Sequence, residues 1–209
     1  MIIAVDGPTA AGKGTIARAV AEHFRLPYLD TGLLYRAVGR QVEIMGGDPD
    51  NPFDARSACT FPEGLLDNPI LRTEAVGGLA SRVSIHPQVR EALMARQRDF
   101  AHQAGGAVLD GRDIGTVIVP DADVKLFITA SAAARVQRRF SEMRARGVPI
   151  DREDIAADIA KRDARDSERA NAPLMAAADA IRIDTTLLSS DEAIATAIAS
   201  INMHHRAAK

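Results

Sequence analysis

The stretch VDGPTAAGKGT, residues 5–15, has the residue types of a phosphate-binding loop. It follows the apolar run IIAVD (2–6) and precedes an amphipathic helical pattern from Lys13 to Phe24. Gly7, Gly12 and Lys13 fit the spacing G-x-x-x-x-G-K, in which small residues let backbone N–H groups face an anion and the lysine reaches the β- and γ-phosphates. The alternative, a glycine-rich turn without a ligand, is disfavoured because a strand directly precedes this loop and a helix directly follows it.

One position departs from most phosphate loops, because Gly14 stands where a serine or threonine usually follows the lysine. A hydroxyl for phosphate or Mg²⁺ must then come from Thr15 or Thr9, and we expect Mg²⁺ to arrive with the nucleotide and to be held largely through water. A phosphate loop is shared by kinases, GTP switches and motor ATPases, so residues elsewhere must identify the reaction.

A second group of chemically capable residues lies in the helical pattern from Arg152 to Arg169. Its apolar stripe starts at Ile155 and Ile159, and at helical spacing the same line continues with charged residues: Arg162, Asp166 and Arg169, flanked by Arg165. A solvated face would carry these charges opposite the isoleucines. We therefore interpret this half of the helix as bordering a polar site with guanidinium groups aimed at anionic oxygens. A salt-bridge ladder among the arginines and the aspartate is the alternative, and the two interpretations are compatible.

Two polar segments follow predicted strands. In DTGLLYR (30–36), the hydroxyl of Thr31 and the guanidinium of Arg36 could contact a second substrate. In DGRDIG (110–115), Asp110 is suited to a magnesium-bound water, Arg112 to a phosphate and Asp113 to hydrogen-bond donors. A turn rich in charged residues is the alternative for the second segment.

The elements that must position these residues alternate between strands and helices. Apolar segments predict strands at 2–6, 27–30, 107–110, 124–130 and 180–185, and periodic patterns predict helices at 13–24, 32–45, 73–102, 132–146, 152–169 and 191–204. Ser189 and Glu192 form a capping-box pattern before the last helix. The near-continuous apolar strands predict a five-stranded parallel sheet covered on both faces, in a three-layer α/β sandwich. Residues 46–64 read as a loop-rich excursion and 144–154 as a small lid joining two helices.

Composition excludes several classes of protein. The chain has 209 residues, a net charge of -2 and 4% aromatic residues without tryptophan, which argues against a nucleic-acid or membrane-surface binder. Arginine accounts for 22 of the 26 basic residues, which suits phosphate binding but also follows from base composition of a genome. Cys59 is the single cysteine, so no internal disulfide can form. No apolar run reaches the ~20 residues of a membrane span, and we expect a cytoplasmic protein.

Taken together, the motifs resemble the bacterial cytidylate (CMP) kinases, of the nucleoside monophosphate kinase class. The resemblance covers nearly the whole chain, through DGPTAAGKGT, DTGLLYR, VREALMARQR, LDGRDIGTV, RDARDSERANAPL and DAIRIDTT in the family's order. It implies phosphoryl transfer from ATP to CMP, and to dCMP, in pyrimidine nucleotide metabolism, with Mg²⁺ and no general base. It also implies the P-loop kinase fold, with a short substrate-binding insert and a small lid, and a monomer.

The resemblance assigns roles residue by residue. It implies catalytic roles for Lys13, Asp110, Arg112 and Arg162, and ATP binding by Gly7, Pro8, Thr9, Ala10, Ala11, Gly12, Lys13, Gly14, Thr15 and Arg138. It implies CMP binding by Thr31, Arg36, Ser81, Arg90, Arg112, Asp113, Arg162, Asp166 and Arg169. Within that set, Ser81, Arg90 and Asp113 would contact cytosine with Arg169 close by, Arg162 and Asp166 the ribose, and Arg36, Arg112 and Arg162 the monophosphate. No direct protein ligand to the metal is expected, although Thr15 and Asp110 would lie near it through water.

In this interpretation residues 1–209 form one kinase domain, with a core at roughly 1–35 and 104–209, a monophosphate-binding region at roughly 36–103 and a lid at roughly 144–154. Many family members carry a longer insert with a small β-sheet where this chain has the short stretch 46–70, which bears on substrate closure and on rejection of UMP. Two alternatives remain at this point: a P-loop kinase for another small acceptor such as UMP, and a nucleotide-binding regulator without catalysis.

Overall fold

The computed structural model describes residues 1–169 and 171–207, and the chain divides into two compact units. Unit 1 comprises Met1–Leu29 and Ala101–Lys209, and unit 2 comprises Asp30–Phe100. We describe each unit by itself.

Unit 1 is built on a parallel sheet. Its strands are β1 (Ile3–Asp6), β2 (Tyr28–Asp30, whose last residue opens unit 2), β3 (Val108–Gly111), β4 (Val124–Thr129) and β5 (Ile181–Asp184), in the order β2-β3-β1-β4-β5. The first strand, β1, lies between β3 and β4 and pairs in parallel with both, and β4 pairs in parallel with β5. The predicted five-stranded parallel sheet is therefore confirmed, with each strand end within one residue of its predicted position.

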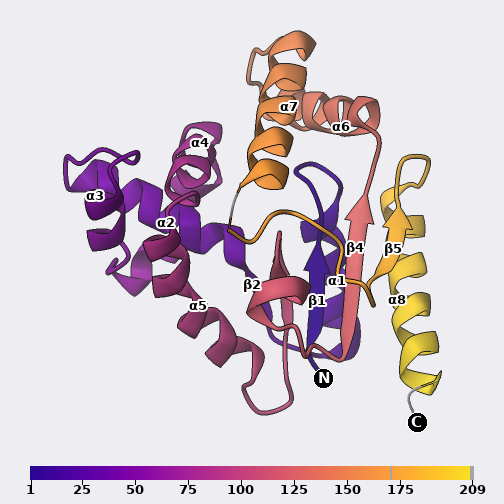
Figure 1. Cartoon of the computed structure of the whole chain (residues 1–209). Coiled ribbons are helices and arrows are strands. Elements are labelled where there is room, and N and C mark those ends of the chain that lie inside the picture. The colour runs from indigo at the N-terminus through magenta and orange to yellow at the C-terminus, as the bar shows by residue number, and fades with distance from the viewer. Residues whose placement is uncertain (170, 208–209) are drawn as a thin grey trace. The chain divides into compact units, whose positions relative to one another are not determined.

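Two helices of unit 1 pack along this sheet. Helix α1 (Lys13–Phe24) and helix α8 (Ser190–Ala207) contact each other (Figure 1), and Ile16, Val20 and Ile201 join the strands in one buried core. The predicted capping box is present, because Ser189 N donates to Glu192 Oε2 (2.8 Å) and Glu192 N donates to Ser189 Oγ (3.3 Å). Helix α1 begins directly after the glycine-rich loop that follows β1, and α8 begins directly after the segment that follows β5.

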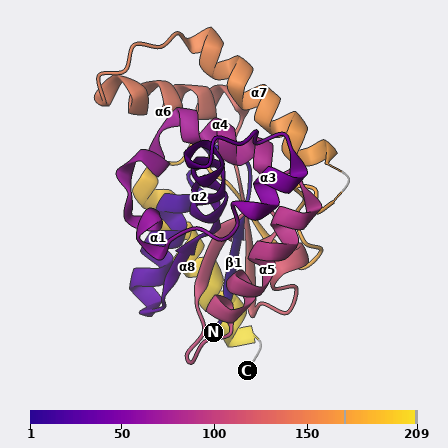
Figure 2. The ribbon, with the colours of Figure 1, turned by 90° about the vertical axis from the view of Figure 1, so that its left-hand side faces the viewer.

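A second pair of helices follows β4. Helix α6 (Ala132–Ala145) and helix α7 (Arg152–Glu168) pack on each other and are joined by a short connection (Figure 2). They lie beyond the carboxyl ends of the strands (Figure 1). The contact buries Met143, Ile155 and Ile159, and the Arg152 guanidinium lies 4.6 Å from the Phe140 ring centroid. The two helices predicted at 132–146 and 152–169 are therefore present, each within one residue of its predicted ends. A π-helical turn at Ile114–Ile118 is an element that the sequence did not predict.

Unit 2 is helical in its described structure. It contains α2 (Thr31–Ile44), α3 (Pro52–Ser57), two 3₁₀ turns (Glu63–Asp67 and Pro69–Arg72), α4 (Glu74–Val83) and α5, which spans Pro87–Ala101 and extends into unit 1 by its last residue. Helices α2 and α4 cross closely at Gly39, where a Cβ would lie 2.7 Å from Leu79 Cβ. A glycine is therefore required at this crossing.

Two predictions for unit 2 were wrong. The single helix predicted at 73–102 is two helices, because Pro87 disfavours helical geometry at His86, whose Nε2 instead lies 2.9 Å from the Pro49 carbonyl oxygen. The stretch predicted as loop-rich contains α3, which is capped by Asn51 accepting from Phe53 N (2.9 Å). Among residues 1–169 and 171–207, no helix combines the length and apolarity needed to cross a membrane.

Candidate active site

The phosphate loop between β1 and α1 has a backbone conformation that its glycines allow. A Cβ on Gly7 would lie 2.0 Å from the Ile128 carbonyl oxygen, and Gly12 has φ +91°. Ala10 has φ +58°, a left-handed conformation that costs a non-glycine residue about 1–2 kcal/mol. Helix α1 begins without a side-chain cap at Gly12 and without an acidic residue in its first turn, so its positive end is open to an anion.

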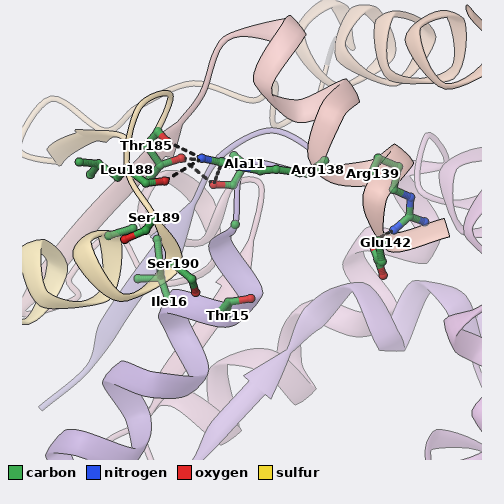
Figure 3. A pocket seen from close by; sticks show the side chains of 13 residues that line it. Ala11, Thr15, Ile16, Arg138, Arg139, Glu142, Thr185, Leu188, Ser189 and Ser190 are labelled. Carbon is green, nitrogen blue, oxygen red and sulfur yellow. Dashed lines mark hydrogen bonds and ion pairs between the residues drawn. The ribbon is translucent and has the colours of Figure 1, made fainter. Parts of the chain in front are cut away.

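The carbonyl groups of this loop bond to side chains behind it. Thr9 O accepts from Arg135 Nη1 (3.3 Å), and Ala11 O accepts from Thr185 Oγ1 (3.1 Å) and from Arg138 Nη1 (3.4 Å). Because the C=O and N–H of a trans peptide point in opposite directions, donors behind the loop favour N–H groups that face its interior. Figure 3 shows Arg138 and Thr185 converging on Ala11.

Lys13 and Asp110 are brought together by the start of α1 and the end of β3. Lys13 Nζ lies 3.3 Å from Asp110 Oδ1, and both side chains are largely buried. Tyr28 OH donates to Asp110 Oδ2 (3.3 Å). The carboxylate at this strand end therefore lies beside the lysine of the phosphate loop.

Asp6 links β1 to the loop that follows β3. Its two carboxylate oxygens accept from Ile114 N and Gly115 N, each at 2.8 Å. Burial raises the pKa of Asp6 to about 6, against the two N–H donors, which lower it. The side chain thus fixes the segment that carries Arg112 and Asp113 to the residue before the phosphate loop.

Arg112 and Asp166, predicted to bind CMP, form an ion pair across this part of unit 1. Arg112 Nε lies 2.7 Å from Asp166 Oδ2, and Arg112 Nη2 donates to Thr9 Oγ1 (3.1 Å). Burial disfavours the charged guanidinium, but Asp166, Asp110 and Asp6 outweigh it and raise the pKa of Arg112 above its ordinary value. The arginine therefore stays charged and bridges α7 to the phosphate loop.

Two other arginines at the charged end of α7, Arg162 and Arg169, also bond to nearby residues. Arg162 Nε lies 2.9 Å from Asp158 Oδ2, and Arg169 Nε donates to Ala172 O (2.7 Å). Asp166 takes its ion pair from the loop after β3 through Arg112, a partner that the ladder interpretation did not include. Ile155 and Ile159 are buried and the charged residues below them are half-buried, as expected for a helix that changes from core to polar site along one line.

Arg135 and Asp163 are site residues that the sequence reasoning missed. Arg135 is 6% exposed, and its Nη1 and Nη2 donate to Asp163 Oδ1 (2.9 Å) and Oδ2 (2.6 Å). Its signal in the sequence was the three-residue spacing from Arg138, which places both arginines on one face of α6.

A cavity of about 460 Å³ adjoins the phosphate loop within unit 1. Its walls come from the loop and the first turn of α1, from α6, and from the segment between β5 and α8 (Figure 3), and they include five of the predicted ATP-binding residues: Ala10, Ala11, Gly12, Thr15 and Arg138. Arg138 bonds through its N–H edges to Thr185 O, Thr185 Oγ1 (2.9 Å) and Leu188 O (3.4 Å). A base could then stack on the flat face of this guanidinium.

Few side chains near the phosphate loop could ligate a divalent cation. Within the described parts of the chain, no group of three or more His, Cys, Asp or Glu side chains is arranged to hold a metal ion. The Asp110 carboxylate beside Lys13 and the Thr15 hydroxyl at the cavity are nevertheless hard oxygen ligands. They fit a Mg²⁺ ion that arrives with a nucleotide and keeps most of its water.

Unit 2 contains the other predicted CMP-binding residues, on α2, α4 and α5. Arg36 Nη1 donates to Leu71 O (2.7 Å) and Thr73 O (2.8 Å), and a Cβ on Gly77 would lie 2.9 Å from Arg36 Nη2. Arg90 is buried, with its guanidinium 5.8 Å from the Tyr35 ring centroid. Thr31 is buried at the start of α2, and Ser81 is half-buried on α4, where its carbonyl accepts from Ser84 Oγ (3.1 Å).

A phosphate loop between the central strand of a parallel sheet and a helix defines unit 1 as a P-loop nucleotide-binding fold. The family model described as cytidylate kinase matches residues 3–203, and this chain belongs to that family. The resemblance seen in the motifs is thereby confirmed.

Individual relatives agree with this assignment. Cytidylate kinases of Granulibacter bethesdensis (56% identity, 92% of each chain), Cereibacter sphaeroides (52%, 96% of this chain and 95% of the relative) and Azorhizobium caulinodans (51%, 96% and 98%) are similar over nearly the full length. A crystal structure of an uncharacterized protein from Eubacterium ventriosum has the same fold, with a TM-score of 0.57 at 17% identity over 97% of this chain and 98% of that one.

Proposed function

We propose that this protein transfers the γ-phosphoryl group of ATP to CMP, giving ADP and CDP, in pyrimidine nucleotide metabolism. The observation that carries the proposal is the sequence identity of more than 50% to cytidylate kinases over nearly the whole chain. The phosphate loop and its adjoining cavity support the donor half of the reaction.

ATP binds, in this proposal, with its phosphates on the loop at residues 7–15 and its adenine in the cavity. Backbone N–H groups and the open end of α1 hold the phosphates, and Lys13 moves from Asp110 towards the β- and γ-phosphates. The adenine stacks on Arg138, whose edges are held by the carbonyls of the segment before α8.

CMP recognition draws on two groups of residues. Unit 1 contributes Arg112 and Arg162 for the monophosphate, Arg162 and Asp166 for the ribose, and Asp113 with Arg169 for the cytosine side. Unit 2 contributes Arg36 for the monophosphate, Ser81 and Arg90 for cytosine, and Thr31 at the start of α2. Three of these arginines, Arg36, Arg112 and Arg162, face phosphate or ribose, and a guanidinium can bind two anionic oxygens at once.

Selection of cytosine over uracil follows from their hydrogen-bonding groups. Cytosine has an amino donor at N4 and acceptors at N3 and O2, whereas uracil has the opposite groups at positions 3 and 4. Asp113 accepting from N4 and Arg90 donating to N3 would suit cytosine, and each mismatch with uracil at these two positions costs about 1–3 kcal/mol. Two mismatches give a preference of roughly a hundredfold or more. We further propose that dCMP is a substrate, at a rate set by how strongly Asp166 holds the ribose.

The chemistry is positioning and charge neutralisation. Phosphoryl transfer through a loose transition state needs little acid–base help, so we assign no general base. Lys13, Arg112 and Arg162 surround the transferring group with positive charge, and Asp110 keeps Lys13 in place before ATP binds. Bound Mg²⁺, near Thr15 and Asp110 through water, would supply further neutralisation of the phosphate oxygens.

The test is a coupled assay of ADP release with ATP and Mg²⁺, offering CMP, dCMP, UMP, AMP and GMP separately. We expect strong turnover with CMP and dCMP and at least about a hundredfold lower kcat/KM with UMP. Comparable kcat/KM for UMP would show that the short segment 46–70 has loosened base selection. Absence of turnover with every acceptor would contradict the proposal and leave a nucleotide-binding regulator as the better description.

A further inference from the structure

We propose that Arg135 and Asp163 are a positioning pair that holds the phosphate loop in its anion-binding conformation and thereby sets the affinity for ATP. Arg135 contacts the loop through one carbonyl, and Asp163 acts only through Arg135. The inference rests on the donor-binding role of the loop proposed above.

The contacts of Arg135 fix the whole plane of its guanidinium. Two N–H groups bind Asp163 at 2.9 and 2.6 Å, and Nε donates to Ala130 O (3.1 Å) at the end of β4. Nη1 also donates to Thr9 O (3.3 Å) in the loop. A bidentate pair sets orientation as well as energy, so the donor that faces Thr9 is held in place by three other bonds.

The Thr9 carbonyl matters because of the residue that follows it. The peptide that joins Thr9 to Ala10 is planar, so a carbonyl turned towards Arg135 turns the Ala10 N–H the opposite way. Ala10 is in the left-handed region, with φ +58°, which an alanine adopts only where surrounding contacts hold it. Releasing Thr9 O lets Ala10 relax and turns its N–H away from the position where a phosphate would accept it.

Asp163→Asn is the first variant, because asparagine keeps one acceptor but presents an NH₂ group to a guanidinium that can only donate. We expect the KM for ATP and the dissociation constant of ATP measured by calorimetry without CMP to rise about tenfold, the change for a lost hydrogen bond to a charged group. The KM for CMP should change less than about threefold. Arg135→Lys, which keeps the charge but loses the planar fork, should give the same pattern and serves if the first variant does not fold.

Asp179→Asn is the matched control. Asp179 also accepts through both oxygens from a buried cation of unit 1, Lys125 Nζ at 3.0 and 2.7 Å, and its described contacts do not include the loop. A merely structural role for Arg135 and Asp163 predicts that both substitutions lower the melting temperature without changing either KM. The positioning role predicts a change in ATP binding for Asp163→Asn alone.

The decisive measurement repeats Asp163→Asn in an Ala10→Gly background. Glycine adopts the left-handed conformation without strain, so the loop should then depend less on Arg135. We expect the Asp163→Asn effect on the ATP dissociation constant to fall from about tenfold to under about threefold. An equal effect in both backgrounds, or equal rises in the KM of ATP and CMP, would overturn the proposal. Calorimetry needs no acceptor, so a wild-type protein that binds ATP but does not phosphorylate CMP would contradict the proposed function and leave this test intact.

Discussion

In the function proposed above, the phosphate loop of unit 1 and the region around Arg36 on α2 of unit 2 would both bind phosphate, and they present positive groups in different ways. The loop uses backbone N–H groups and a helix end, whereas the Arg36 region uses a guanidinium that two carbonyls hold on α2. In each, a glycine makes room for a close contact: Gly7 against the Ile128 carbonyl and Gly77 against Arg36. The phosphate loop thus depends on the backbone conformation of a few consecutive residues. The Arg36 site depends on how the surrounding helices pack against one side chain. Substitutions in the phosphate loop should therefore lower activity strongly, whereas substitutions around Arg36 should weaken substrate binding only moderately.

Lys13→Ala tests the phosphate loop at its single charged side chain and should have the largest effect. We expect kcat/KM to fall by at least about 10²–10³-fold, because a preorganised charge on the phosphates is lost. Steady-state rates with CMP measure this, and Lys161→Ala, which removes an exposed lysine of α7, should leave them unchanged. Residual activity above a tenth of wild type would contradict the assigned role of Lys13.

Asp6, the residue directly before the phosphate loop, should make the stability of the protein depend on pH. Since burial raises the pKa of this carboxyl from 3.8 to about 6, the folded state holds the proton more tightly than the unfolded state. The resulting stability is present at low pH and is lost as pH rises through about 4 to 6, so the free energy of unfolding should fall by about 2 kcal/mol between pH 4.5 and 6.5 from this group.

Urea unfolding of wild type and Asp6→Asn at both pH values isolates this contribution. The variant loses one of the two acceptors for Ile114 N and Gly115 N, which changes its stability at every pH. Its free energy of unfolding should, however, lack the fall between pH 4.5 and 6.5 that Asp6 causes. Identical slopes for the two proteins would place the pKa of Asp6 near its ordinary value and contradict the prediction.

Asp113→Ala separates acceptor from donor binding. We expect the KM for CMP to rise tens of fold and the KM for ATP to change less than about threefold, because the cytosine amino group loses a charged acceptor. Asp113→Asn, which retains one acceptor oxygen, should lose less. Equal rises in the KM of both substrates would remove Asp113 from the cytosine site.

Gly77→Ala tests the Arg36 site and should have the smallest effect. The added methyl group would lie 2.9 Å from Arg36 Nη2, and we expect the KM for CMP to rise about fivefold as the guanidinium shifts. The KM for ATP should be unchanged. Gly78→Ala is the control on the same helix, since nothing lies within 4 Å of its Cβ position, and it should raise stability by up to about 1 kcal/mol. A CMP effect of equal size in both variants would show that Gly77 does not act through Arg36.

Local patterns predicted unit 1 more closely than unit 2. The strands of the parallel sheet are mostly apolar segments with an aspartate or a threonine at the last residue or the one before it, so their positions follow from the sequence alone. The division of 73–102 into two helices also had a local signal, Pro87, which the helical periodicity on either side concealed. The roles assigned to the CMP-binding residues of both units remain predictions, because they come from the family's motifs.

The sequence by itself determined the phosphate loop, the parallel sheet and the family, because each of these depends on neighbours in the chain: glycines at fixed spacing, apolar runs and ordered motifs. Only the tertiary structure decided which side chains support the loop. Arg135 lies 126 residues from Thr9 and 28 from Asp163, and Thr185 lies 174 residues from Ala11. Hydrogen bonds over such separations arise when strands and helices pack, and no periodicity in the sequence encodes them.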